Sequence, residues 1–256
     1  MSFGTHTPRF YPVQGGDDRP SVTTILSVLD KPALVPWAAR VTAEYIQSHI
    51  DDCFDADEIY ELCNTAKNDF RAVSQTACDI GTAVHRAVEL SLKQTGIDEA
   101  VETALDETGI KKPDDVERVW NGTGAFHKWE KDHGVTPLAL EVRMDNAELG
   151  YAGRVDFVGY VNGKLTLIDF KTSKAFYPEY AMQTAAYRDC EPETGDFHPA
   201  DIVANGVLRL DKNTGKPHYK DYSEFYEYDL DMFQLLCRFY HLQMERKRVA
   251  KERRAK

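Results

Sequence analysis

Two carboxylates and one lysine occupy positions at which two adjacent predicted strands could bring them together. Asp156 lies in the first strand, Asp169 and Lys171 lie in the second, and Asn162-Gly163 between them is a strong signal for a two-residue hairpin turn. An antiparallel hairpin would place Asp156 close to Asp169. Asp169 and Lys171 are two residues apart on a strand, so their side chains point to the same face. Clustered carboxylates suit a hard divalent cation such as Mg²⁺, and an ammonium beside them could orient a water or steady a phosphoryl oxygen.

The surroundings of Asp169 favour a functional role over a solvent-facing strand end. The residue is embedded in the run Leu167-Ile168-Asp169-Phe170, where burying a charge is costly unless it is paired or bound to a metal. Lys171 has a plain surface lysine or salt-bridge partner as its structural alternative. The sequence therefore predicts a metal or phosphate site at this end of the hairpin.

The strands that position these residues follow a period of two. Alternating apolar residues and turn signals between them predict five strands. They are expected over 138–144, 151–160, 164–171, 202–210 and 219–228, with a turn over 211–217. A helix that Pro178 opens, and that runs to about Arg188, separates the third strand from the fourth.

The remaining periodic segments predict helices around this sheet. Residues 1–20 are expected to form an extended arm because proline and glycine recur there. Apolar residues at helical spacing then predict the flanking helices. Two helices are expected to begin at Val22 and after Pro36, and three more to cover 51–70, 72–92 and 116–133, with Gly134 stopping the last of them. A short helix is expected within 95–115, and a long basic helix from Asp231 to the end. The order of elements indicates an α/β domain with a mixed sheet and helical additions.

Composition and charge limit the kind of protein. The chain has 256 residues, of which 42% are apolar and 29% charged, enough for one large domain with a sizeable core. The formal net charge of −11 argues against a protein that coats nucleic acid but allows one that holds it in a local basic groove. No apolar run approaches the roughly 20 residues that cross a bilayer, and the N-terminus lacks a signal pattern. A cytoplasmic protein without membrane contact is therefore expected.

Several short motifs resemble one nuclease family. Asp156 followed by Asp169-Phe170-Lys171 resembles the D…(D/E)-x-K core of the PD-(D/E)XK nucleases. The spacing of Gly81 and His85 resembles the G-x-x-x-H helix of the RecB-like exonuclease branch, where the histidine is a metal ligand. Further matches to this branch are the Q-x-x-x-Y pair Gln183 and Tyr187, and the segments 21–23 and 34–37, which resemble the N-terminal part of phage-encoded exonucleases.

The resemblance implies a fold and an activity. The expected fold is an α/β restriction-endonuclease-like core with a central mixed β-sheet flanked by helices, plus an N-terminal helical module. The expected segments are an arm and helical module over 1–71, the nuclease core over 72–230 and a basic helix over 231–256. The expected activity is that of an exonuclease acting on single-stranded or duplex DNA ends with one or two Mg²⁺ or Mn²⁺ ions, in phage or prophage DNA recombination or processing. A homo-oligomer or a recombination partner protein is left open.

Two alternatives to the exonuclease remain open. One is a structure-specific or restriction-type DNA endonuclease, which would keep the chemistry but cut within the strand. The other is a non-catalytic nucleic-acid-binding protein with a relict nuclease fold, against which the intact set of Asp156, Asp169 and Lys171 argues. An iron–sulfur cluster, which occurs in some relatives, is not expected, because the five cysteines are widely spaced and no CxxC occurs.

The resemblance also assigns roles to individual residues. The predicted metal ligands are His85, Asp156, Asp169 and the backbone carbonyl of Phe170. The predicted catalytic residues are Asp156, Asp169, Lys171, Gln183, Tyr187 and Glu141. Glu141 could hold a water, Lys171 or a second metal ion, and a packed tyrosine beside a solvated glutamine is the alternative for Gln183 and Tyr187. Four residues that flank these motifs in the sequence are predicted to contact phosphates of a nucleic acid, with solvated loop residues as the alternative: Arg154, Thr172, Ser173 and Lys174.

Other charged or titratable segments are not predicted to belong to the active site. Pro113-Asp114-Asp115 matches the first motif literally but lies far from the hairpin in sequence, in a segment interpreted as a charged loop. His127 and His133 lack a supporting motif and are interpreted as structural or exposed. The basic residues from Arg246 to Lys256 could bind nucleic acid, but a frayed, solvated helix end is the commoner explanation.

Overall fold

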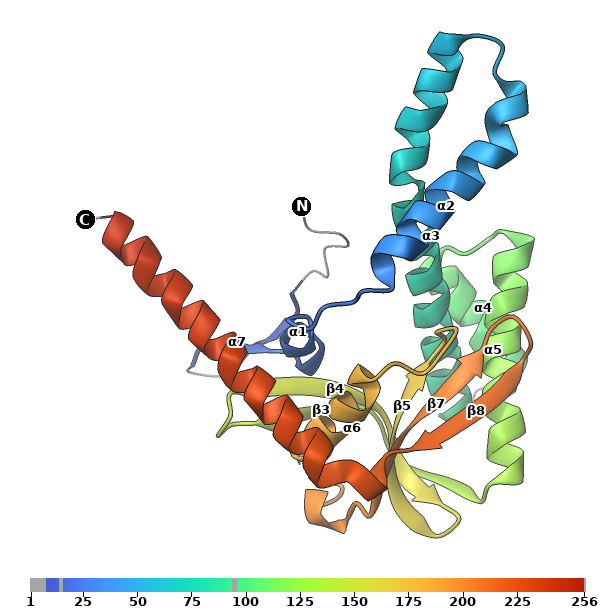
Figure 1. Cartoon of the computed structure of the whole chain (residues 1–256). Coiled ribbons are helices and arrows are strands. Elements are labelled where there is room, and N and C mark those ends of the chain that lie inside the picture. Colours follow the sequence, from blue (N-terminus) through green and yellow to red (C-terminus); the bar gives the residue numbers. More distant parts are fainter. Residues whose placement is uncertain (1–7, 14–15, 94–95, 256) are drawn as a thin grey trace.

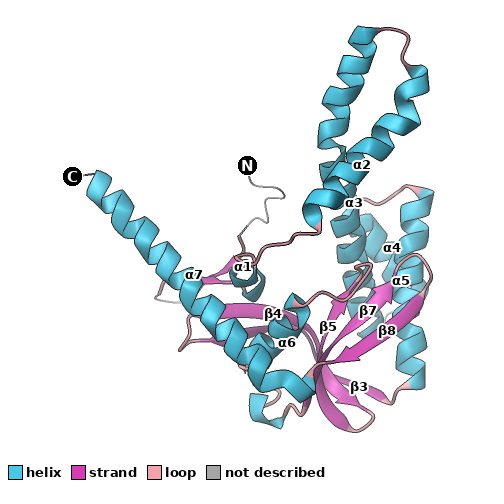
Figure 2. Ribbon diagram, in the orientation of Figure 1, coloured by secondary structure: helices cyan, strands magenta, loops and turns pink. Residues whose placement is uncertain are grey.

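The structure, a computed structural model, describes residues 8–13, 16–93 and 96–255. A six-stranded mixed sheet lies at its centre (Figures 1 and 2). From edge to edge its strands are β6 (Glu191–Pro192), β3 (Val135–Asn146), β4 (Tyr151–Val161), β5 (Lys164–Lys171), β7 (Ala204–Asp211) and β8 (Lys216–Asp221). All neighbours are antiparallel except β5 and β7, which run in parallel. This arrangement confirms the expected α/β class with a restriction-endonuclease-like core.

Helices surround this sheet and extend beyond it. They are α1 (Val22–Leu26), α2 (Leu34–His49), α3 (Ala56–Leu92), α4 (Ile97–Thr108), α5 (Pro113–Asp132), α6 (Glu179–Arg188) and α7 (Tyr226–Arg254), with 3₁₀ turns η1 (Ile50–Asp52), η2 (Pro199–Asp201) and η3 (Ser223–Phe225). None of the helices within the described ranges is long and apolar enough to cross a membrane.

The β4–β5 hairpin has the geometry that its turn sequence predicts. Asn162 and Gly163 have φ angles of 50° and 78°, as a two-residue hairpin turn requires. α6 lies between β5 and β7 in sequence and supplies the long crossover that a parallel pair needs. β5 is buried from Leu165 to Phe170, because helices cover both faces of the sheet.

Helices on the two faces of the sheet build two apolar cores. On one face, α3 and α5 pack Val84 and Phe126 against Ile168 of β5 and Leu208 of β7. On the other face, α1, α6 and α7 pack together against β4 and β5. The buried side chains of this second core include Ile25, Met182, Phe233, Val155 and Leu167. The sheet is therefore the middle layer of a three-layer domain.

The longest helix, α3, serves both the core and a protruding hairpin. Its first half pairs with α2 and projects away from the sheet (Figure 1), while its second half packs on the sheet. Asp55 begins the helix as its N-cap, because its carboxylate accepts hydrogen bonds from the N–H groups of Asp57 and Glu58 at 2.9 Å. The helices predicted over 51–70 and 72–92 are thus one continuous helix, and the boundary expected at residue 71 lies inside it.

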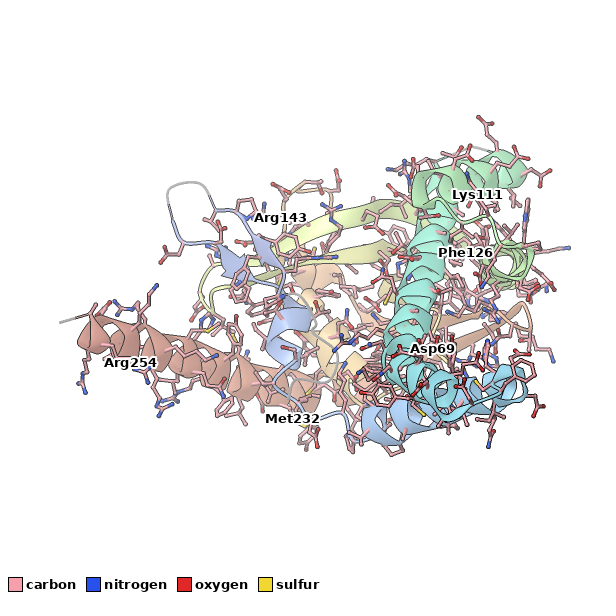
Figure 3. The ribbon with its side chains drawn as sticks, turned by 90° about the horizontal axis from the view of Figure 1, so that it is seen from above. Asp69, Lys111, Phe126, Arg143, Met232 and Arg254 are labelled. Atoms are coloured by element: carbon pink, nitrogen blue, oxygen red, sulfur yellow. The ribbon has the colours of Figure 1, made fainter. Side chains whose placement is uncertain are left out.

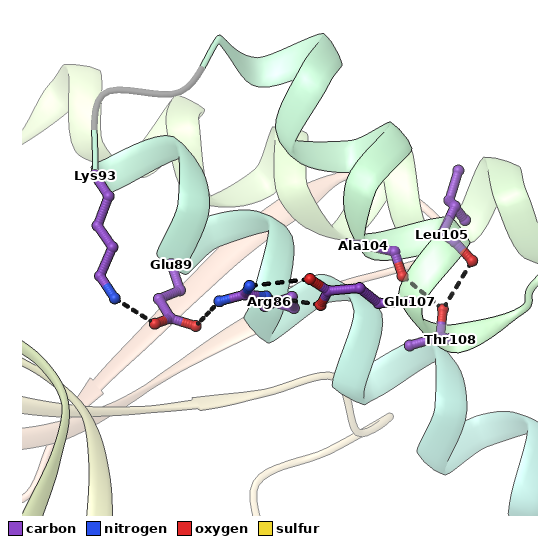
Figure 4. A network of polar contacts seen from close by, with 7 residues as sticks. All are labelled: Arg86, Glu89, Lys93, Ala104, Leu105, Glu107 and Thr108. Atoms are coloured by element: carbon purple, nitrogen blue, oxygen red, sulfur yellow. Dashed lines mark hydrogen bonds and ion pairs between the residues drawn. The ribbon is translucent and has the colours of Figure 1, made fainter.

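A polar network ties α4 to the half of α3 that packs on the sheet (Figure 4). Arg86 donates to both carboxylate oxygens of Glu107 at 2.8 and 3.0 Å and to Glu89 at 2.9 Å. Lys93 donates to the other oxygen of Glu89 at 2.6 Å. Through Arg86, these bonds link α4 to the turn of α3 that directly follows His85.

Three predictions about local structure are wrong. Pro113-Asp114-Asp115 is not a loop but the first turn of α5, where proline and acidic side chains are favoured. α5 ends at Asp132 because His133 adopts an extended backbone, so Gly134 supplies no left-handed cap. The fifth strand covers 216–221 rather than 219–228.

The end of β8 has an identifiable cause. The carboxylate of Asp221 accepts hydrogen bonds from both the N–H and the hydroxyl of Ser223, which turns the chain into η3. α7 then begins at Tyr226, inside the segment that alternation assigned to a strand. The boundary expected at residue 230 therefore also lies inside a helix.

The N-terminal arm is partly structured. β1 (Phe10–Tyr11) pairs with β2 (Arg19–Pro20), and Arg19 forms an ion pair with Asp145 of β3. The parts of the predicted arm over 1–7 and 14–15, and Lys256 at the basic end, lie outside the described residues.

Candidate active site

The β4–β5 hairpin sets the position of Asp156. Phe157 lies opposite Ile168, so Asp156 falls next to the Asp169–Phe170 peptide. One of its carboxylate oxygens accepts a hydrogen bond from the N–H of Phe170 at 2.5 Å. The predicted approach of Asp156 to the second strand is confirmed.

His85 reaches this carboxylate from α3. Its Nδ1 lies 3.1 Å from the other oxygen of Asp156, and the edge of its ring packs against Phe170 at 5.9 Å between centroids. Gly81, one helical turn earlier, explains how the helix comes so near: a Cβ at this position would lie 3.1 Å from the hydroxyl of Thr172. The spacing of Gly81 and His85 therefore has a physical basis, since the small residue lets the helix approach the end of β5.

Glu141 completes a cluster with these two residues. Leu140 lies opposite Phe157 and Val142 opposite Val155, so Glu141 lies across from Asp156. Its φ of 51° is in the left-handed region, which non-glycine residues adopt at an energetic cost and which is enriched at functional sites. One donor atom from each of His85, Glu141 and Asp156 lies within 4.8 Å of the others. The structure therefore places Glu141 beside His85 and Asp156, where its carboxylate could hold a metal ion together with them.

Asp169 has different partners. One of its oxygens lies 2.7 Å from Nζ of Lys171, and the other accepts a hydrogen bond from Nε2 of Gln183 at 3.0 Å. Its side chain is almost entirely buried. Among the described residues the metal-ligand cluster contains Glu141 and not Asp169, so the role of Asp169 as a ligand stays a prediction, as does that of the Phe170 carbonyl.

Gln183 and Tyr187 share one face of α6, directed at the site. The amide of Gln183 donates to the hydroxyl of Tyr187 at 3.0 Å as well as to Asp169. Both residues are buried, which contradicts the alternative of a solvated glutamine. A Cβ at Gly153 would overlap the Tyr187 ring, so this glycine allows α6 to lie close on β4.

The pKa values in the site reflect burial and an excess of carboxylates. Burial raises the pKa of Asp169 to about 6, with Asp156 adding to the effect and Lys171 opposing it. Burial, again with Asp156 adding, raises the pKa of Glu141 to about 7. Burial also acts to raise the pKa of Asp156, but the charge and hydrogen bond of His85 outweigh it and hold this pKa below its usual value. Burial acts to lower the pKa of His85, and Asp156 reverses this.

This balance fits a divalent cation. The raised pKa values of Glu141 and Asp169 show that the site has too little positive charge to hold all of its carboxylates in the charged form, and a bound cation would supply that charge. An imidazole and two carboxylates from three different elements, with donor atoms close together, can hold a divalent metal ion, and the carboxylates are the ligands that suit Mg²⁺ or Mn²⁺. The residues present therefore fit the expected metal ion.

The predicted nucleic-acid contacts lie around the cluster without defined roles. Arg154 is exposed on β4, and Lys174 is exposed in the loop after β5. Thr172 lies against Gly81, and the hydroxyl of Ser173 donates to the carbonyl of Ala175 at 2.8 Å. All four belong to the strands that carry the carboxylates or to the loop after β5, and their contact with DNA stays a prediction.

One residue of the site was missed from the sequence. Tyr180 of α6 is buried, and Nζ of Lys171 lies 5.1 Å from the centre of its ring. Its spacing of three from Gln183 and seven from Tyr187 places all three on one helix face, which is the signal that could have found it.

The residues that were set aside have local partners. Asp115 is buried and pairs with Arg118 at 3.0 Å. Nδ1 of His127 lies 2.9 Å from Glu130, and Nδ1 of His133 lies 2.8 Å from the carbonyl of Trp129. These contacts agree with structural roles on α5.

A family model described as the PD-(D/E)XK nuclease superfamily matches residues 58–236. The matched region includes the whole cluster, all of α6 and all but the first two residues of α3. No curated protein matches the chain significantly.

Proposed function

The chain belongs to the PD-(D/E)XK nuclease superfamily, and on this basis we propose that it is a metal-dependent DNA exonuclease. The observation that carries the proposal is the cluster of His85, Glu141 and Asp156, with the Asp169–Lys171 pair on the adjoining strand. The RecB-like branch is supported by two contacts that its motifs make here. His85 contacts Asp156, and Gln183 bonds to Asp169.

We assign His85, Glu141 and Asp156 as the residues that hold the metal ion, with Asp169 and the Phe170 carbonyl as further candidates from the resemblance. A bound Mg²⁺ or Mn²⁺ stabilises negative charge on the scissile phosphate and lowers the pKa of a water molecule. His85 and Glu141 approach Asp156 from α3 and β3, so the site depends on the packing of both elements against the hairpin.

Lys171 supplies the positive charge for catalysis. Burial lowers its pKa, but the carboxylates of Asp169 and Asp156 outweigh this and raise it, so the ammonium keeps its proton. Asp169 and the Tyr180 ring fix its position from two sides. A lysine held in this way orients the attacking water or stabilises the charge that develops on the phosphate. The hydrogen bond from Gln183 fixes the orientation of the Asp169 carboxylate and therefore of the Asp169–Lys171 ion pair.

We propose ends of single-stranded or duplex DNA as the substrate, in phage or prophage recombination or processing. The likeness of segments 21–23 and 34–37 to phage-encoded exonucleases supports this context. Ser21 caps α1, whose apolar residues pack in the core that α6 shares, so the first of these segments contributes to the support of the Gln183 helix.

The test follows release of label from end-labelled linear DNA, single-stranded and duplex, with Mg²⁺, Mn²⁺ or chelator. We expect metal-dependent degradation by the wild type and no cleavage by Asp169→Ala or Lys171→Ala. Lys164→Ala is the matched control, because Lys164 is an exposed lysine at the other end of β5. Normal cleavage by both site variants would disprove this mechanism.

Circular substrates separate the proposal from its alternatives. A strict exonuclease needs an end and leaves closed circles intact. Cleavage of circular single-stranded or duplex DNA would identify an endonuclease. Binding of DNA without cleavage under any metal would identify a nucleic-acid-binding protein with a relict nuclease fold.

A further inference from the structure

The C-terminal helix α7 carries apolar residues on two opposite faces. The inner face packs in the core through Leu230, Phe233, Cys237 and Tyr240, all of them buried. The outer face is apolar over the same length but lies in solvent. We name it the outer stripe; its residues are Tyr228, Met232, Leu235, Phe239 and Leu242, which are 70%, 46%, 69%, 49% and 60% exposed.

The spacing of the outer stripe is that of a coiled-coil seam. Its residues follow one another at intervals of four, three, four and three, and exposed Phe225 precedes Tyr228 by three. With about 100° per residue, the five side chains fall within a sector of about 80°, opposite the inner face. Helices that are apolar on opposite faces are buried on both in folded proteins. The outer stripe thus has the form of a helix–helix interface.

We propose that the outer stripe is the interface of a homodimer in which α7 pairs antiparallel with α7 of a second copy. An antiparallel pair centred between Phe233 and Gln234 places Met232 against Leu235 of the second copy. The same register places Tyr228 against Phe239 and Phe225 against Leu242. Every member of the stripe therefore meets an apolar partner, as a two-fold interface requires.

The charges beside the stripe agree with this direction. Asp231 and Arg238 are both exposed and lie on the same flank of the stripe, Asp231 about one turn before Leu235 and Arg238 about one turn after it. The antiparallel register brings Asp231 of each copy near Arg238 of the other, which gives two symmetry-related opposite-charge pairs. A parallel pair would instead place the basic ends around Arg246 and Arg253 side by side, where like charges repel.

The area is of the size that a dimer needs. Large aromatic side chains offer about 150–250 Å² each, and at this scale the exposed fractions of the stripe and of Phe225 amount to roughly 500–900 Å² per copy. A standard interface buries about 800 Å² per partner. Figure 3 shows α7 running from Met232, near the body of the protein, to Arg254 at the far end of the helix. This inference goes beyond the proposed function and does not depend on it.

The test measures the mass of the full-length chain by analytical ultracentrifugation at about 1–100 µM. We expect the wild type to sediment as a dimer, at twice the chain mass of 29.1 kDa. Leu235→Glu should raise the dissociation constant by at least about 30-fold, because a charge would enter the centre of the interface from both copies. Leu235 is exposed in the single chain, so the variant should keep the circular dichroism spectrum and thermal midpoint of a folded monomer.

Val203→Glu is the matched control, because Val203 is 56% exposed but lies outside α7, and this variant should remain dimeric. Asp231→Arg and Arg238→Asp should each weaken the dimer, and the double variant should restore it. A wild type that is monomeric throughout the range, or a Leu235→Glu variant that is as dimeric as the wild type, would overturn the proposal. A dimer whose charge variants show no such restoration would overturn the antiparallel arrangement.

Discussion

Replacing Glu141 by glutamine distinguishes a metal ligand from a structural carboxylate. If Glu141 is a ligand, the substitution should raise the stability of the metal-free protein and lower its metal affinity. Burial and the neighbouring Asp156 raise the pKa of Glu141 from 4.5 to about 7. The folded state therefore binds more protons than the unfolded chain between these pH values, and folding becomes less favourable as the pH rises through this window. The cost of holding the charged carboxylate is fully present above pH 7 and absent below pH 4.5. We expect Glu141→Gln to stabilise the metal-free protein at pH 8.

The magnitude follows from the shift in pKa. At about 1.4 kcal/mol per pKa unit, the full rise corresponds to about 3 kcal/mol. The side chain is partly exposed, so solvent screening reduces the expected gain to about 1–2 kcal/mol. Glutamine keeps the backbone at φ 51° and so leaves the local strain unchanged, which restricts the comparison to the charge.

The assay is urea denaturation of the wild type and Glu141→Gln at pH 5 and pH 8, with chelator and with Mn²⁺, together with calorimetric titration of Mn²⁺. The variant should be more stable than the wild type at pH 8 with chelator, nearly equal at pH 5, and weaker in metal affinity by at least about 10-fold. Glu148→Gln, at an exposed position beyond the end of β3, is the control and should change neither quantity. A variant that is less stable without metal and binds Mn²⁺ normally would refute the assignment of Glu141 as a ligand.

Three further predictions concern packing, orientation and pH. Gly153→Ala should lower the free energy of unfolding in urea by about 1–3 kcal/mol because its Cβ would overlap Tyr187, whereas Gly124→Ala, with open space around it, should not. Gln183→Leu should reduce kcat at least about 10-fold, since Asp169 and Tyr187 lose their shared donor, and an unchanged kcat in the DNA assay would contradict this role. Metal affinity should rise from pH 5 to pH 8, because a bound ion displaces protons from Asp169 and Glu141, whose pKa values are raised to about 6 and about 7. Titration in buffers of different ionisation enthalpy would detect the released protons. An affinity that does not change with pH would contradict this prediction.

The site illustrates which contacts can be predicted from short-range pattern. The Asn162-Gly163 turn fixes the register of the hairpin, and the register brings Asp156 to the Asp169–Phe170 peptide. Only the resemblance predicts that Gln183 borders the active site, and its hydrogen bond to Asp169 emerges from the structure because the two residues lie on different elements. The place of Glu141 in the cluster depends on the register between β3 and β4 and on a left-handed backbone angle. No local pattern in the sequence specifies that angle.

The fold shows the same division. The period of two predicts the strands of the sheet, but the end of β8 depends on the hydrogen bonds from Ser223 to Asp221. The aromatic residues that follow Asp221 are typical of a strand, so the sequence predicts that the strand continues past this point. The sequence predicts separate helices over 51–70 and 72–92, whereas the structure has the single helix α3 (Ala56–Leu92). Pairing of α2 with α3 keeps it as one helix, which is a tertiary effect.

The sequence by itself determined the chemistry that this protein can perform. Residue types and their spacing within single elements specify the carboxylates, the lysine, the hairpin turn and the helix faces, because these depend on neighbours only a few residues away. The tertiary structure alone decided which donors meet. His85 and Asp156 are separated by 71 positions, and their contact forms because burial of the apolar faces of α3 and β4 in one core brings the two elements together.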